Sequence, residues 1–176
     1  HQKRGYLETI TPQLNKKQLY ETSGHWDHYR ENMFICDMGE NEIYCLKPMN
    51  CPNAMTIFKQ GIHSYRDLPL RLSDCDALHR HEKSGELGGL LRVQKFAQDD
   101  AHIFVTEDQI SEEYKRILEI ANLFYSIFGI KFKIRLGTRP DDFMGDIVTW
   151  DKAEKELEQI LIDNKFDYFI GEGEGA

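Results

Sequence analysis

Four stretches rich in strand-forming residues follow one another through the middle of the chain, and only short connections separate them. The stretches cover residues 68–72, 77–82, 91–96 and 101–105. Parallel neighbours in a sheet need a crossover of a dozen or more residues, usually a helix, and these connections are too short to form one. The spacing therefore predicts an antiparallel sheet, which is the strongest constraint that the sequence places on the fold.

Two amphipathic helices are predicted after this sheet. Over residues 107–128, apolar side chains recur at spacings of three and four, which places them on one face of a helix. Thr106 and Gln109 form a capping-box pattern at its start, and Gly129 stands where a left-handed residue commonly ends a helix. A second helix with the same kind of pattern is predicted over residues 152–163.

Shorter elements complete the predicted fold. They are strands over residues 5–12 and 131–136, a hairpin of residues 33–38 and 43–47, and a helix over residues 54–59. A further helix is predicted to begin at or just after Pro12, with Thr11 as its N-cap. The class is α+β, an antiparallel sheet flanked by helices, and no repeat or linker indicates a second domain.

The charge balance limits the partners that the chain can bind. Its formal net charge is −8 at pH 7, which disfavours a surface built to coat nucleic acid with clustered lysine and arginine. No apolar run approaches the roughly 20 residues that span a bilayer. The four cysteines lack a CxxC pair, which indicates reduced thiols. We therefore expect a cytoplasmic protein with no membrane partner and only local RNA contact.

Charged and polar residues are concentrated on two of the predicted strands, in His79-Arg80-His81-Glu82 and in the run from Arg92 to His102. Side chains two residues apart share a face of a strand. One face would then carry two guanidiniums, a carboxylate and the ring of Phe96. Such a set can hold polyphosphate oxygens and stack on a purine without a glycine-rich loop. From alternation alone, charges that only solvate an exposed hairpin are the more common case.

The order of these residues resembles a known family. Arg80-His81-Glu82, nine further residues, then Arg92 and Phe96 resemble motif 2 of the class II aminoacyl-tRNA synthetases, here near residues 79–102. Residues 5–12 look like the end of motif 1, which lies at the dimer interface of that family. Further segments are similar to those of threonyl-tRNA synthetases in particular, namely Thr22 to Trp26, Leu46 to Pro52, Ser64 to Pro69 and Gln98 to Phe104.

This resemblance implies one partial catalytic domain over residues 1–176, without editing or anticodon-binding domains. Its reaction would be the attack of threonine on the α-phosphate of ATP with Mg²⁺ bound, and transfer of the product to tRNA(Thr) by a homodimer. Arg80 would stabilise the transition state at the α-phosphate, and Arg92 would bind the outer phosphates. Glu82 would accept a hydrogen bond from the adenine amino group, and Phe96 would stack on the ring.

The resemblance also implies a zinc ion that selects threonine. Cys51 and His102 match two of three family ligands, although a cysteine and a histidine this far apart are more often core residues. Met49, Gln98 and Asp100 would line the threonine pocket. Valine is nearly isosteric with threonine, so a site that must bind a hydroxyl discriminates far better than an apolar pocket. The other histidines are predicted to be packing or surface residues.

Some positions depart from the family pattern. Asn53-Ala54 stands where the family usually has a histidine after Asn-Cys-Pro. Gly88-Gly89-Leu90-Leu91-Arg92-Val93-Gln94 stands where the family usually has His-Gly-Leu-Thr-Arg-Val-Arg, so an imidazole and a guanidinium are missing around Arg92. Residues 171–176 resemble a glycine-rich stretch before the next substrate-binding strand. The third zinc ligand and the motif 3 arginine would lie beyond it, so we expect this chain alone to bind zinc weakly and to form little adenylate.

Three other functions are weighed against this prediction. A non-catalytic synthetase-like module that binds a partner or regulates translation is favoured slightly by the departures. The intact Arg80, Glu82, Arg92, Cys51 and His102 argue against it. A zinc hydrolase would need a compact ligand set such as HExxH, which the sequence lacks. A class II enzyme for proline or serine shares motif 2 but not the implied zinc pair.

Overall fold

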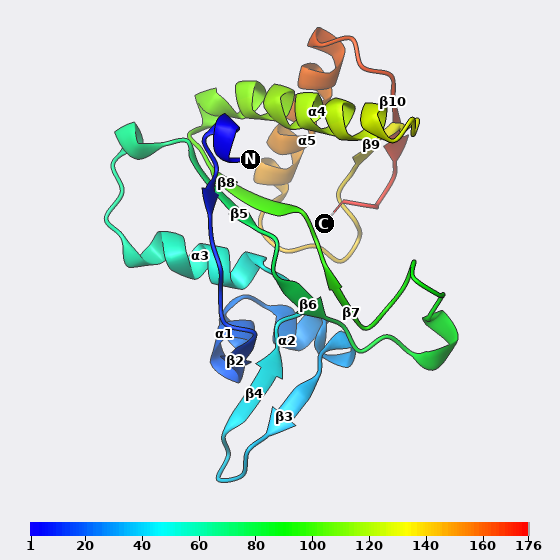
Figure 1. Ribbon diagram of the computed structural model, residues 1–176. Helices are drawn as coiled ribbons and strands as arrows, with labels where there is room; N and C mark the ends of the chain where they lie inside the picture. The colour runs from blue at the N-terminus through cyan, green and yellow to red at the C-terminus, as the bar shows by residue number, and fades with distance from the viewer. Residues whose placement is uncertain (176) are drawn as a thin grey trace. The chain divides into compact units, whose positions relative to one another are not determined.

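The computed structural model describes residues 1–175, which form two compact units (Figure 1). The first unit extends from His1 to Val105, and the second begins at Thr106. The helices of the first unit are α1 (Lys17–Thr22), α2 (His25–His28) and α3 (Cys51–Gln60), with short 3₁₀ turns at Gln2–Arg4, Arg30–Asn32, Tyr65–Asp67 and Ser84–Glu86. Its strands are β1 (Leu7–Glu8), β2 (Leu14–Lys16), β3 (Ile35–Asp37), β4 (Ile43–Leu46), β5 (Leu70–Asp74), β6 (Ala77–His79), β7 (Lys95–Ala97) and β8 (Asp100–Phe104).

The four central strands are antiparallel, as predicted from their spacing. Strand β5 pairs with β8, with Leu72 opposite His102 and Asp74 opposite Asp100, and β6 pairs with β7. Strand β6 ends at His79, earlier than predicted, but the pairing continues locally because Arg80 N donates to Gln94 O at 2.9 Å. Strand β1 pairs in parallel with β5 and forms an edge of the β1-β5-β8 sheet. The spacing of the central strands gives no information about this pairing.

The predicted hairpin over residues 33–47 is confirmed as β3 and β4, and it extends away from the rest of the first unit in Figure 1. The helix expected at Pro12 is wrong. Residues Leu14–Lys16 form β2, which pairs with β4, and α1 begins only at Lys17. Thr11 does not cap a helix, because its hydroxyl donates to Asp74 instead.

Lys47 directly follows β4 and is completely buried among groups from two other segments of the chain. Its Nζ donates to Thr11 Oγ1 at 2.9 Å and forms ion pairs with Asp76 at 3.2 Å and Asp74 at 3.6 Å. Its backbone N–H donates to Gln13 O. We call these residues the Lys47 cluster. A buried cation is tolerated only when it is paired and hydrogen-bonded, and this cluster meets both conditions.

The second unit packs two helices with a parallel pair of strands. Its elements are a 3₁₀ turn (Glu107–Gln109), α4 (Ile110–Ile127), β9 (Ile134–Gly137), α5 (Ile147–Asp163) and β10 (Tyr168–Gly171). The predicted capping box of Thr106 and Gln109 is present, and Gly129 has the expected left-handed backbone, with φ of 65°. Helix α5 begins before the predicted residue 152, because Asp146 caps it by accepting from Thr149 N. No helix within residues 1–175 is both long and apolar enough to cross a membrane.

Candidate functional site

Five of the predicted site residues line a single cavity of about 380 Å³ in the first unit. Strand β7, the residues after β6 and the intervening loop supply its walls. The lining residues are Arg80, Glu82, Leu90, Leu91, Arg92, Val93, Phe96 and Gln98. Two guanidiniums, a carboxylate and an aromatic ring therefore reach one hollow, the arrangement that the period-two pattern predicted. Gln94, on the same predicted face, supports the wall by donating to Glu82 O.

Arg80 is held by contacts on two sides. Its guanidinium carbon lies 5.1 Å from the centre of the Phe96 ring and 6.0 Å from that of Tyr29. Its Nε donates to Pro48 O at 3.3 Å, which ties it to the segment just before α3. Cation–π contact and a backbone acceptor leave the guanidinium with little freedom, so its charge has a defined position in the cavity.

Glu82 and Arg92 pair with each other across the cavity. Nη2 and Nε of Arg92 donate to the same Glu82 oxygen at 2.8 and 3.2 Å, and Glu86 lies 3.6 Å from Nη2. These hydrogen bonds from Arg92 lower the pKa of Glu82, which is almost buried. The carboxylate therefore stays ionised at neutral pH, and the paired charges compensate each other inside the cavity.

Strand β8 and the start of α3 carry the predicted metal and threonine residues. Asn50 Nδ2 donates to Asp100 Oδ2 at 3.0 Å, which joins the two elements. Cys51 is a free thiol whose pKa is raised by burial and then by the nearby Asp100 charge. His102 Nδ1 is buried and has no hydrogen-bond partner within residues 1–175. Over the same residues, no three metal-ligating side chains are gathered into one group.

His25 lies beside the predicted threonine residues, although sequence reasoning counted it among packing or surface histidines. Its Nε2 is 3.2 Å from Met49 Sδ, and its Nδ1 hydrogen bonds with Ser23 Oγ at 2.9 Å. Burial lowers the pKa of His25, so the ring is largely neutral at pH 7. The only sequence signal for a role of His25 was its place in the segment from Thr22 to Trp26, which resembles the family. More than 20 residues separate His25 from Met49, so the sequence did not indicate that they are in contact.

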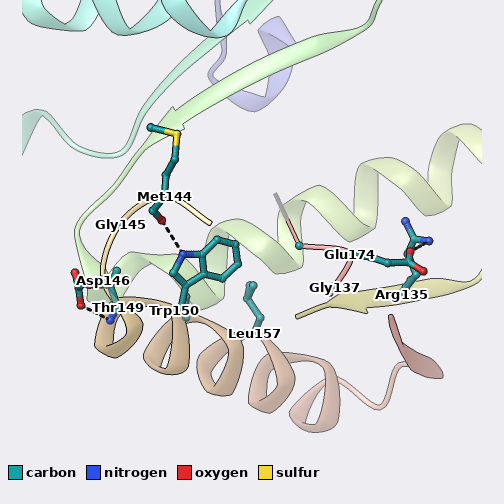
Figure 2. A pocket seen from close by; sticks show the side chains of 11 residues that line it. Arg135, Gly137, Met144, Gly145, Asp146, Thr149, Trp150, Leu157 and Glu174 are labelled. Atoms are coloured by element: carbon teal, nitrogen blue, oxygen red, sulfur yellow. Dashed lines mark hydrogen bonds and ion pairs between the residues drawn. The ribbon is translucent and has the colours of Figure 1, made fainter. Parts of the chain in front are cut away.

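A second hollow of about 510 Å³ lies in the second unit and contains none of the predicted site residues. Figure 2 shows Trp150 of α5 extending into it, with its indole N–H donating to Met144 O at 2.8 Å. Leu157 lies on the same helix, and Arg135 forms an ion pair with Glu174 at the far end. This hollow is mainly apolar, whereas the first cavity is lined by two guanidiniums and a carboxylate.

Comparison with known families decides how this site should be interpreted. Residues 34–170 match the family model described as the tRNA synthetase class II core domain (G, H, P, S and T). The chain belongs to the class II tRNA synthetase core family. The residues around the first cavity and the Asn50–Asp100 contact all fall inside this class II core match.

The class II core chain is similar along its whole length to threonine–tRNA ligases. That of Thermotoga neapolitana is 49% identical over 176 residues, all of this chain and 27% of the relative. Human threonine–tRNA ligase 1, cytoplasmic, is 48% identical over the same 176 residues and is covered to 24% of its length. The chain thus spans about a quarter of the length of these relatives.

A solved structure gives the same result for the fold. The crystal structure described as the RNA binding domain of threonyl-tRNA synthetase from Cryptosporidium parvum superposes with a TM-score of 0.95 at 43% identity. The match covers 99% of this class II core chain and 44% of that chain. The mixed helix and antiparallel-sheet architecture is therefore that of a class II synthetase core.

Proposed function

We propose that this chain carries the ATP and threonine sites of a threonine–tRNA ligase, which joins threonine to tRNA(Thr). The observation that carries the proposal is the convergence of Arg80, Glu82, Arg92 and Phe96 on one cavity. This set offers positive charge for phosphates, an acceptor for an amino group and a ring for stacking. The similarity to threonine–tRNA ligases over the whole chain supports threonine as the amino acid.

Arg80 acts on the reacting phosphate. Its guanidinium is fixed against Phe96 and Pro48 O, so it can meet negative charge that develops on the α-phosphate without rearranging. Preorganised charge of this kind stabilises a transition state more than it stabilises the substrate. Mg²⁺ bound with ATP would neutralise charge between the phosphates.

Glu82 and Arg92 exchange partners when ATP binds. Glu82 gives its hydrogen bond to the adenine amino group, and Arg92 turns to the outer phosphates, so both charges remain compensated. Phe96 covers the purine ring. The nucleotide thus replaces an existing ion pair, and part of its gross binding energy goes into breaking it.

Threonine binds beside Asp100, with Gln98 and Met49 lining its pocket. A carboxylate that must accept a hydrogen bond from the side-chain hydroxyl penalises valine, which has a methyl group at that position. Gln98 lines the ATP cavity and lies two residues from Asp100, so it joins the two halves of the site. His25 contacts Met49 through its Nε2 atom.

Zinc fits the two ligands that this chain offers. His102 Nδ1, which has no partner among residues 1–175, and the free thiol of Cys51 are the kinds of donor that zinc binds, and over the same residues no third ligand is gathered beside them. When bound, zinc would supply coordination for the amino and hydroxyl groups of threonine. Asp100 and Met49 then orient that amino acid.

We also propose a cytoplasmic homodimer that pairs through residues 5–12. Leu7 and Ile10 in this segment are 57% and 82% exposed, so apolar surface is free to meet a second copy. Exposed apolar groups that cluster on one segment are typical of an interface.

The deciding experiment is a thermal-shift titration of the purified chain with Mg-ATP, threonine and Zn²⁺, each alone and together. Ligands that bind only the folded state raise its melting temperature. We expect a shift with Mg-ATP that Arg80→Ala abolishes, and a threonine shift that requires zinc. Absence of any shift would favour a non-catalytic module. Threonine-dependent ATP–pyrophosphate exchange at rates typical of whole enzymes would contradict the expectation that this chain alone is nearly inactive.

A further inference from the structure

Asn50 is buried at the start of a helix, but its side chain does not cap that helix. It stands at the N-cap of α3 and is 1% exposed. Asparagine is favoured at this position because its side-chain oxygen accepts a hydrogen bond from the first turn. Here the side chain makes no capping bond, and its Nδ2 points to Asp100 Oδ2 at 3.0 Å.

This arrangement costs stability in two ways. The helix loses a capping bond, and the Asn50 Oδ1 atom is buried without a partner within residues 1–175. Buried acceptors without partners are uncommon in folded proteins and call for an explanation. Helix stability alone would not select this side-chain orientation, whereas the contact with Asp100 accounts for it.

Both oxygens of Asp100 are fixed. Oδ2 accepts from Asn50, and Oδ1 accepts from the N–H of Ala101 at 2.9 Å. A carboxylate oxygen has two lone pairs, so each can still accept one more hydrogen bond. The group is thus held in one rotamer while it retains capacity for a donor from a ligand.

We propose that Asn50 is a positioning residue that sets the amino-acid specificity of the site. It aims the Asp100 carboxylate so that this group accepts a hydrogen bond from the side-chain hydroxyl of a bound β-hydroxy amino acid. The inference rests on the proposed function and adds a residue to it. Asn50 touches no substrate atom; it acts through Asp100.

The same helix contains a matched control. Asn53 is also buried in the first turn of α3, at 7% exposure, and its Oδ1 is likewise without a partner in the described chain. Its Nδ2 donates to Asn15 Oδ1 at 3.1 Å, on β2 rather than on β8. Replacing either asparagine by leucine exchanges a buried amide for an apolar side chain with the same number of heavy atoms. Only Asn50 should change the amino-acid site.

A second variant separates function from folding. Asn50→Ser introduces another favoured N-cap residue, which can cap α3 but is too short to reach Asp100 in the same way. We expect Asn50→Ser to unfold at a temperature close to that of the unchanged chain and still to lose threonine affinity. A structural role alone would not produce this separation.

The experiment measures binding of threonine, valine and Mg-ATP by ligand-observed NMR in excess Zn²⁺, for the unchanged chain and the variants. We expect Asn50→Leu and Asn50→Ser to weaken threonine binding about ten-fold, the effect of losing one charged hydrogen bond, and to leave Mg-ATP binding within about two-fold. Asn53→Leu should leave both unchanged. The preference for threonine over valine should fall in the Asn50 variants only.

A measurement without ligand tests the geometry itself. The Nδ2 protons of Asn50 should exchange slowly with solvent, and Asp100→Ala should abolish that protection. Fast exchange in the unchanged chain, equal threonine loss in Asn53→Leu, or equal loss of Mg-ATP and threonine would each overturn the inference. If the unchanged chain binds Mg-ATP but not threonine, the inference fails while the nucleotide site stands. If it binds neither Mg-ATP nor threonine, both the proposed function and the inference fail.

Discussion

Arg92 places two hydrogen bonds on one oxygen of Glu82, and this contact makes the cavity sensitive to pH. Because the pKa of Glu82 is lowered in the folded chain, its stabilising effect is present above the ordinary glutamate value of 4.5. It is lost as the pH falls through the lower folded value. We expect the melting temperature to fall more steeply below pH 4.5 for the unchanged chain than for Glu82→Gln, as followed by circular dichroism. If the two melting temperatures fall in parallel with pH, the Glu82–Arg92 pair contributes nothing to stability.

Phe96 provides the ring that Arg80 contacts, and in the proposed site it covers the purine. Aromatic contacts of this kind contribute about 0.5–1.5 kcal/mol beyond area burial, so Phe96→Ala should weaken Mg-ATP binding roughly three- to ten-fold. Calorimetric titration with Mg-ATP measures this change in affinity. Phe96→Tyr keeps the ring and serves as the control with near-normal affinity. An equal loss in both variants would mean that stacking is not the cause.

At this scale the sequence indicates which residues share the cavity but not how they pair. Period-two alternation predicts that Arg80, Glu82 and Phe96 share a face, and the three line one cavity, although only Phe96 lies on a strand. The Glu82–Arg92 bond and the contact of His25 with Met49 depend on loops and on long-range packing. Neither contact leaves a local pattern in the sequence, so the sequence could not predict either contact.

Helices and strands were likewise predictable where their sequence signal is local, and unpredictable where they depend on distant residues. The long amphipathic helices and the antiparallel pairing of the central strands were predicted correctly because their patterns repeat over many residues. The bounds were less accurate: β7 begins at Lys95 rather than at residue 91, and the β5–β8 and β6–β7 pairs belong to separate sheets. The helix expected at Pro12 failed because residues 14–16 complete a sheet with β4, and tertiary pairing overrode a local start signal. Strand β10 was not predicted, since its partner β9 lies more than 30 residues earlier in the chain.

Helix α5 provides a test of capping. Asp146 accepts from both the N–H and the hydroxyl of Thr149, and these bonds lower its pKa. Asp146→Ala should lower the melting temperature at neutral pH. The difference should shrink as the pH falls from the ordinary aspartate value of 3.8 through the lower folded pKa, because the folded carboxylate is protonated only below that lower value. Thermal melts across this pH range measure the difference.

Asp163 at the other end of α5 is the control for this prediction. A negative charge at a helix C-terminus is unfavourable to the helix dipole, so Asp163→Ala should not destabilise the chain through that dipole. If Asp146→Ala and Asp163→Ala lower the melting temperature equally, capping is not the reason.

At the scale of the whole molecule, the proposed pairing through residues 5–12 can be tested directly. Ile10 is 82% exposed, so Ile10→Asp should leave the fold intact and halve the mass measured by light scattering. Ile62, which is fully exposed in the same unit, gives the control Ile62→Asp with unchanged mass. A single mass for all three proteins would exclude Ile10 from any dimer contact.

The Lys47 cluster has a consequence for where the polypeptide can be shortened. Thr11 and Gln13 come from the first segment of the chain, yet they surround a lysine that follows more than 30 residues later. A shorter version that starts after Gln13 would expose this ammonium group and its acidic neighbours to water and would remove β1 from the sheet. The N-terminal stretch is therefore an integral wall of the first unit, and a polypeptide trimmed there should become an open target for proteases.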